Sequence, residues 1–140
     1  MSPKLDVDAF NTIVREELPF AHAVGITALS LSATGAVVLL PFDDQHLRPG
    51  GTISGPSIFC LADVCMYAAV LAALGPVKQA VTTNLTIDFL RRPEPGPLTA
   101  EGTILKLGRR LAVIRVDVLD ASRILVAHAT GTYSIPTARG

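Results

Sequence analysis

The sequence predicts an α+β fold, in which an antiparallel β-sheet packs on one long central α-helix. Three observations lead to this prediction. Residues 56–74 form a long apolar run, and the segments before and after it show the alternation and the turn residues of β-hairpins. The chain has 140 residues, of which 49% are hydrophobic. We therefore expect one domain over residues 1–140, with a sizeable core and consecutive strands that run antiparallel.

The first forty residues predict a helix followed by a hairpin. Residues 6–18 place apolar side chains at helical spacing after an acidic start, and we expect Pro19 to end this short N-terminal helix. Residues 24–32 and 35–42 are typical of two strands joined by a tight turn at Ala33 and Thr34.

The central helix is expected to follow a loop that is rich in Pro and Gly. Pro56 suits a first helical turn, and Gly75 followed by Pro76 ends a helix. Apolar residues cover every face of this helix, and Asp63 is its only formal charge. Such a helix is buried in a protein or spans a membrane. A carboxylate at mid-bilayer costs about 3 kcal/mol or more, so we expect a core helix and no membrane partner.

Residues 80–90 alternate as a strand, with Thr82 and Asn84 on a polar face and Thr83 on the opposite face with Leu85. The prolines that follow, within residues 91–97, should interrupt the sheet.

The last third of the chain predicts three further strands. Residues 98–107 and 111–120 form a hairpin across Gly108, and residues 124–135 end the sheet. The inner face of the last strand would consist of Leu125, Ala127, Ala129, Gly131, Tyr133 and Ile135. The small residues in its middle leave room for a helix to lie close to the sheet.

Charge and cysteine content exclude several classes of function. Lys+Arg and Asp+Glu both number 12, so the net charge is zero and we expect no nucleic-acid partner. Cys60 and Cys65 would point about 140° apart on a helix and cannot bridge each other, so we expect two buried thiols in a cytoplasmic protein. Three scattered histidines at no ligand spacing predict no metal site.

One stretch resembles a known family. Residues 46–70 read HLRPGGTISGPSIFCLADVCMYAAV, and residues 82–93 read TTNLTIDFLRRP. Over about residues 20–136 the chain is similar to the hotdog-fold acyl-CoA thioesterases, in the phenylacetate-degradation (PaaI-like) branch of the 4-hydroxybenzoyl-CoA thioesterase superfamily. It departs from the family pattern at Arg48 (usually Asn), Ser54 (usually His) and Pro56 (usually Gly).

The resemblance implies a hotdog fold, a sheet curled around the helix, and a homodimer that is often a dimer of dimers. It also implies active sites at the dimer interface, each with a helix carboxylate and a backbone N–H at the helix start. On this chain those groups are Asp63 and Gly55. The resemblance places Thr82 near the position of a hydroxyl that orients the attacking water; a threonine on a solvated face is the alternative.

The residues themselves fit this chemistry. Asp63, flanked by apolar side chains, would be poorly solvated and hence a stronger base or nucleophile, unless a nearby hydroxyl or Arg merely satisfies it. The Gly55 N–H lies where unpaired donors and the helix dipole favour an oxyanion. The two residues are about 12 Å apart along the helix, so one thioester would need Gly55 and Asp63 from different chains packed antiparallel.

Several other residues are candidates for the substrate site. Arg91, Arg92, Arg109 and Arg110 form two loop pairs that could bind the phosphates of coenzyme A or lie free in solvent. We also expect His46, Arg48 and Asn84 to contact substrate. Ser54 either donates to the reacting oxygen or caps the helix.

The sequence thus predicts a cytoplasmic acyl-CoA thioesterase that needs no cofactor beyond the coenzyme A of its substrate. One alternative is a non-catalytic acyl-CoA-binding protein, since Arg48 and Ser54 depart from the family pattern. A second is an enoyl-CoA hydratase or dehydratase, which would need a catalytic histidine beside the carboxylate.

Overall fold

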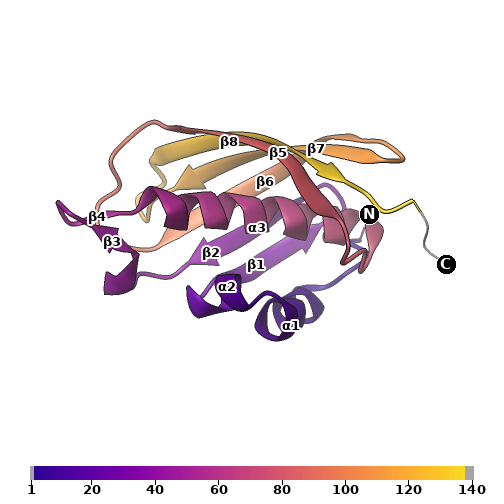
Figure 1. Cartoon of the computed structure of the whole chain (residues 1–140), viewed down its shortest axis with the longest axis horizontal. Coiled ribbons are helices and arrows are strands. Elements are labelled where there is room, and N and C mark those ends of the chain that lie inside the picture. The colour runs from indigo at the N-terminus through magenta and orange to yellow at the C-terminus, as the bar shows by residue number, and fades with distance from the viewer. Residues whose placement is uncertain (1, 138–140) are drawn as a thin grey trace.

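The computed structural model describes residues 2–137, which form a six-stranded antiparallel sheet curled around one long helix (Figure 1). The strand order is β1-β2-β6-β7-β8-β5. The helices are α1 (Val7–Glu17), α2 (Pro19–Ala23) and α3 (Gly55–Leu74). The strands of this sheet are β1 (Thr27–Ser32), β2 (Gly35–Leu40), β5 (Val81–Phe89), β6 (Leu98–Leu107), β7 (Leu111–Leu119) and β8 (Leu125–Ser134). This arrangement confirms the predicted α+β hotdog architecture.

The N-terminal helix is confirmed, and a second short helix was not predicted. Asp6 caps α1, since its side chain accepts a 2.8 Å hydrogen bond from the Ala9 N–H. Pro19 does follow the end of α1, but it also begins α2. Proline is compatible with a first helical turn because its fixed φ is helical and its missing N–H needs no partner there.

The central helix is the core of the fold rather than a membrane span. Its length and composition would allow it to cross a membrane, but 72% of its most apolar 18-residue window is buried inside the fold. Gly75 ends it with a φ of +95°, which favours glycine, as expected from the sequence.

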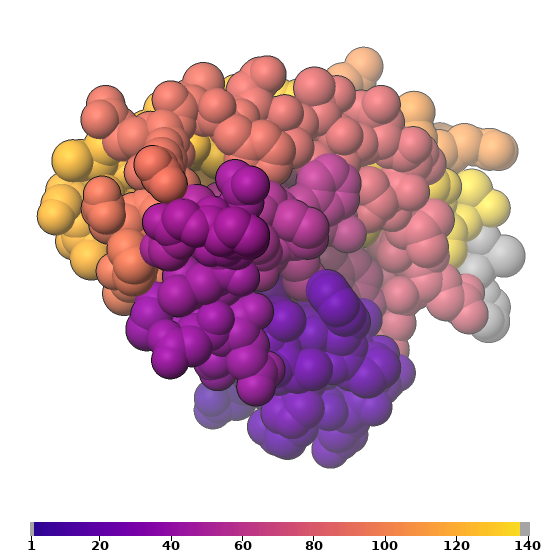
Figure 2. Space-filling view, turned by 60° about the vertical axis from the view of Figure 1, so that its left-hand side comes forward, coloured from indigo at the N-terminus to yellow at the C-terminus, as the bar shows by residue number. Residues whose placement is uncertain are grey.

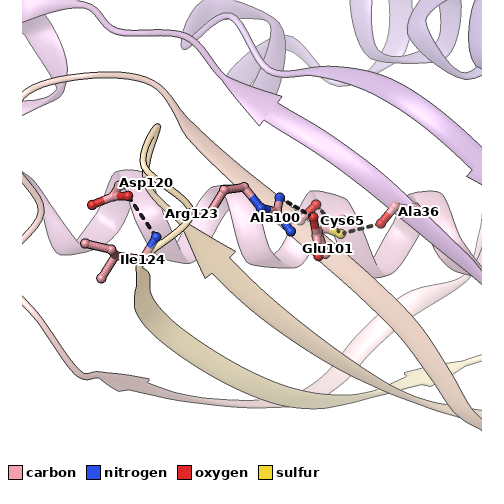
Figure 3. Close-up of polar contacts among 7 residues, drawn as sticks. All are labelled: Ala36, Cys65, Ala100, Glu101, Asp120, Arg123 and Ile124. Atoms are coloured by element: carbon pink, nitrogen blue, oxygen red, sulfur yellow. Dashed lines mark hydrogen bonds and ion pairs between the residues drawn. The ribbon is translucent and has the colours of Figure 1, made fainter.

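Small residues on the sheet let α3 approach closely. A Cβ added at Gly131 would lie 2.5 Å from Met66 Sδ, and one at Gly102 would lie 2.9 Å from Cys65 Sγ. Cys65 Sγ itself lies 3.6 Å from the carbonyl oxygens of both Ala36 and Ala100, on β2 and β6 (Figure 3). The predicted close packing of the helix on β8 is therefore present, and Cys65 is the buried thiol that was expected.

Two predictions of burial are wrong. Leu125 was expected on the inner face of β8, but it is exposed and Val126 is buried instead. The cause is a register shift between β7 and β8 at Val118 and Leu119, which offsets the alternation at the start of β8. Cys60 was expected in the core, but it is only partly buried and lines a surface groove.

Candidate functional site

The loop before α3 has more structure than the sequence predicted. It contains a short 3-10 helix, η1 (Asp44–His46), and a two-stranded hairpin of β3 (Leu47–Arg48) and β4 (Thr52–Ile53). Gly50 and Gly51, with φ values of +95° and +75°, make its turn. Thr52 Oγ1 donates to the Pro93 carbonyl oxygen at 2.7 Å, which ties this hairpin to the segment after β5. On the face seen in Figure 2, the loop into α3 lies next to the segment after β5 on one side and next to the N-terminal helices on the other.

Ser54 is the N-cap of α3. Its Oγ accepts a 3.3 Å hydrogen bond from the Ser57 N–H and lies 2.8 Å from Ser57 Oγ. Gly55 is the first residue of the helix, so its N–H has no acceptor within α3, and no partner for it is found among residues 2–137. Of the two roles considered for Ser54, the geometry supports capping, and Gly55 offers the free N–H.

Replacing Ser54 with Ala should therefore lower the free energy of unfolding by about 1 kcal/mol, because the cap hydrogen bond is lost. Chemical denaturation measures this change, and Ser54→Asn, which retains a capping oxygen, should recover most of it. A loss of turnover of about 100-fold in folded Ser54→Ala would instead assign the hydroxyl to the reacting oxygen.

Three of the predicted arginines meet at the start of α3. Arg48, Arg91 and Arg92 line a pocket of about 550 Å³, and Gly55 lies in its wall. Arg92 Nη2 lies 3.4 Å from the Gly50 carbonyl oxygen. A Cβ at Gly50 would come within 2.7 Å of the same nitrogen, so the glycine also makes room for the guanidinium.

The second arginine pair lies elsewhere in the subunit. The Arg91 N–H donates to the Val126 carbonyl oxygen, whereas the Arg110 carbonyl oxygen accepts from the Ile135 N–H. Val126 and Ile135 are separated by nine residues, about 30 Å along a strand. The structure thus places Arg109 and Arg110 at the opposite end of the sheet from Arg91 and Arg92.

Asp63 lies two turns further along α3 and is partly buried. Its Oδ1 accepts hydrogen bonds from Thr82 Oγ1 and from the Tyr133 hydroxyl, both at 2.7 Å. Its Oδ2 accepts no hydrogen bond from residues 2–137, and it is not among the buried unpaired atoms. One oxygen of the carboxylate is therefore held, while the other is free and accessible.

A β-bulge directs Thr82 toward Asp63. The β5–β8 register shifts between Thr82 and Asn84, so that Thr82, not Thr83, lies opposite Tyr133. The sequence had predicted Thr82 on the polar face with Asn84, which is wrong, because the bulge inserts one residue into the alternation. Thr83 Oγ1 instead donates to the Thr132 carbonyl oxygen at 3.1 Å.

Burial and the Asp63 charge control the protonation of two neighbours. Burial, and then the charge of Asp63, raises the pKa of the Tyr133 hydroxyl well above its usual value. Tyr133 therefore stays protonated and remains a donor to Asp63. Burial, with a smaller effect from Asp63, also raises the pKa of the Cys60 thiol to about 11, so this cysteine is a weak nucleophile near neutral pH.

An apolar groove of about 610 Å³ connects the two ends of the candidate site. Asp63 and Gly55 both contribute to its wall. Its other lining residues are Phe20, Pro56, Phe59, Cys60 and Phe89. On its other side Asp63 borders a cavity of about 450 Å³, whose wall also includes Thr82 and Tyr133. Asp63 and Gly55 thus line one groove and lie about 12 Å apart along the helix axis.

Two predicted substrate contacts lie outside these cavities. His46 is only 4% exposed, its Nδ1 has no hydrogen-bond partner within residues 2–137, and it lines neither the groove nor the two pockets. Asn84 is exposed and adjoins Leu85, which packs on the core, so it lies on the face of β5 away from α3.

Tyr133 is the residue of the site that sequence reasoning missed. Its position on the inner face of β8 was predicted, but only as part of the core. A buried tyrosine hydroxyl usually needs a polar partner. Asp63 is the only charged residue on the helix that faces this strand. The sequence could therefore have suggested a hydrogen bond between Tyr133 and Asp63.

Comparison with known proteins agrees with the fold. The profile of the Thioesterase superfamily matches residues 50–127. The solved structure of a "putative thioesterase" from Silicibacter sp. TM1040 is 41% identical, with a TM-score of 0.85, over 97% of this chain and 95% of that one. A "putative esterase" of Saccharolobus solfataricus is 31% identical over 133 residues, which are 95% of this chain and 87% of the relative. The Escherichia coli PaaI protein of the phenylacetic acid degradation operon is 28% identical, with a TM-score of 0.80 over 89% of each chain.

Proposed function

Because this chain belongs to the thioesterase superfamily, we propose that it hydrolyses acyl-CoA thioesters at sites shared between two subunits. The observation that carries this proposal is that Asp63, with its free Oδ2, and Gly55, with its unpaired N–H, line the same apolar groove. A carboxylate oxygen supplies the base or nucleophile, and an N–H at a helix start supplies the oxyanion donor.

The proposed site combines Asp63 of one subunit with Gly55 of the partner subunit. Phe59 lies midway between these residues on α3 and is 40% exposed. A two-fold axis near Phe59 would bring each Gly55 next to the partner subunit's Asp63, as an isologous interface requires. The exposed edge strand β5 supports the same assembly, since unpaired edges invite pairing. We therefore propose a homodimer, or a dimer of two such dimers.

The chemistry proceeds through Oδ2. This oxygen either takes a proton from a water molecule that attacks the thioester carbonyl carbon, or attacks that carbon itself. The N–H of Gly55 stabilises the negative charge on the carbonyl oxygen, and the C–S bond then breaks to release coenzyme A as a thiolate. Direct attack leaves the acyl group on Asp63 as a mixed anhydride, which water then hydrolyses. Single turnover in ¹⁸O-labelled water identifies this route when water attacks the Asp63 carboxyl carbon, because the first product acid is then unlabelled and Asp63 carries the label. Attack of water on the thioester labels the acid and leaves Asp63 unlabelled.

A substrate screen tests the function as a whole. The purified protein is offered aryl, short-chain and long-chain acyl-CoA esters, with release of free thiol as the measurement and Asp63→Asn as the blank. Sustained release that Asp63→Asn lacks supports the proposal. Tight binding of these esters without turnover would instead identify a binding protein, and addition of water to an enoyl-CoA would identify a hydratase.

The pocket of Arg48, Arg91 and Arg92 is the proposed site for the phosphates of coenzyme A, since one guanidinium group can bind two phosphate oxygens at once.

We also propose a cytoplasmic location. Acyl-CoA is available there, and the free thiols of Cys60 and Cys65 stay reduced.

Arg91→Gln and Arg92→Gln should each raise KM for a CoA ester about tenfold while largely sparing kcat, because each removes a charge-assisted contact made before and during the reaction. Steady-state kinetics on the CoA ester and on a simple thioester without the nucleotide measures the difference. Arg115→Gln is the matched control, since Arg115 is an exposed arginine on β7 outside the pocket. Equal changes on both substrates would assign Arg91 and Arg92 a structural role.

A further inference from the structure

Two hydroxyl groups from neighbouring strands converge on one oxygen of Asp63. Thr82 on β5 and Tyr133 on β8 are direct cross-strand partners, so their side chains point to the same side of the sheet. Both hydroxyls donate to Oδ1 at 2.7 Å, and the Tyr133 hydroxyl also lies 3.0 Å from the backbone oxygen of Asp63. The two contacts restrict rotation of the carboxylate from two sides.

The tyrosine is itself rigidly held. Its side chain is only 3% exposed, and its ring lies 6.2 Å from the Tyr67 ring, which in turn lies 6.0 Å from the Phe10 ring. Phe10 belongs to α1, so three elements of the core fix the position of the Tyr133 hydroxyl. A hydroxyl donor that is fixed in this way also restricts the position of its acceptor, Asp63 Oδ1.

We propose that Tyr133 and Thr82 are positioning residues, which hold Asp63 Oδ1 so that Oδ2 meets the substrate in one orientation. This inference rests on the proposed function, and it gives the bulge in β5 a role, since the bulge places the Thr82 hydroxyl beside that of Tyr133. Orientation matters because reacting atoms must lie about 3–3.5 Å apart, and a displacement of 1 Å can cost about 100-fold in rate.

Kinetics of Tyr133→Phe and Thr82→Val test the inference. Each variant should lower kcat about tenfold with little change in KM, because the carboxylate is misplaced while the binding surface remains. Thr82→Ser, which keeps the hydroxyl, should retain the wild-type rate. Thr83→Val is the matched control on the same strand, since the Thr83 hydroxyl donates to Thr132 and has no contact with Asp63.

A variant cycle separates positioning from a direct role. If both hydroxyls act through Asp63, neither substitution should lower the residual rate further in an Asp63→Asn background. A further tenfold loss in that background would mean that Thr82 or Tyr133 contacts the water or substrate itself, and would overturn the inference. Unchanged kcat in folded Tyr133→Phe and Thr82→Val would overturn it as well.

A measurement without substrate distinguishes this inference from the function on which it rests. The Asp63 carboxyl carbon can be observed by ¹³C NMR at one fixed pH, and identified by its absence in Asp63→Asn. Its chemical shift should change in Tyr133→Phe and in Thr82→Val, because each variant removes a hydrogen bond to Oδ1, but not in Thr83→Val. If wild type hydrolysed no thioester while these changes in chemical shift appeared, the proposed function would be wrong and the positioning of Oδ1 by Tyr133 and Thr82 would be supported. If the changes were absent while hydrolysis was normal, the positioning role would be wrong and the proposed function would be supported.

Discussion

Replacing Asp63 with Asn should lower kcat for acyl-CoA hydrolysis by about 100-fold or more and leave the protein folded. The amide keeps the shape of the side chain, and its oxygen can still accept hydrogen bonds from Thr82 and Tyr133. It cannot take a proton from water or attack a carbonyl carbon, which are the roles proposed for Oδ2. Initial rates at saturating substrate, together with thermal unfolding, measure both parts of this expectation.

Asp88→Asn is the matched control for this prediction. Asp88 is an exposed carboxylate of β5 that lies outside the groove and both pockets, so its removal should preserve turnover. Full activity in Asp63→Asn would refute the assignment of Asp63.

Replacing Gly55 with Pro should lower kcat about 100- to 1000-fold, because it removes the N–H proposed to stabilise the oxyanion. Proline favours the first helical position, and Ser54 before it already has the extended conformation that proline requires, with φ −68° and ψ 148°.

Gly55→Ala is the matched control. It keeps the N–H, so it should lower kcat much less. An added Cβ would meet the Phe89 ring at 3.5 Å, an ordinary contact. Similar rates for the two variants would exclude the N–H as a donor.

Mixing the two inactive proteins tests whether the site is shared. A heterodimer of one Asp63→Asn subunit and one Gly55→Pro subunit contains one site with both groups intact. Activity should therefore return after subunit exchange, up to half of the wild-type rate per heterodimer, since one of its two sites is complete. Exchange can be followed by mass spectrometry of differently labelled subunits. Exchange without recovered activity would place Gly55 and Asp63 of the same chain in each site.

Local signals in the sequence were sufficient for most of the fold. The strand at 98–107 is observed with the predicted bounds, because apolar alternation and flanking Pro and Gly define a strand within a short window. The central helix was predicted within two residues of its observed start, since Pro56 and Gly75 mark helix ends through their own backbone restrictions. The same helix identified Asp63, because one charge in a fully apolar run is visible without any structure.

The tertiary structure alone decided how the site is assembled. The bulge in β5 depends on how that strand pairs with β8, so no local pattern placed Thr82 rather than Thr83 beside Asp63. The division of the four arginines between two ends of the sheet follows from strand register, which the loops do not encode. The burial of His46 likewise depends on a hairpin, β3–β4, whose strands of two residues are too short to leave an alternation in the sequence. Residue types and local periodicity thus determined the elements and the single carboxylate. Long-range pairing between strands determined which side chains hold that carboxylate and which one of its oxygens remains free.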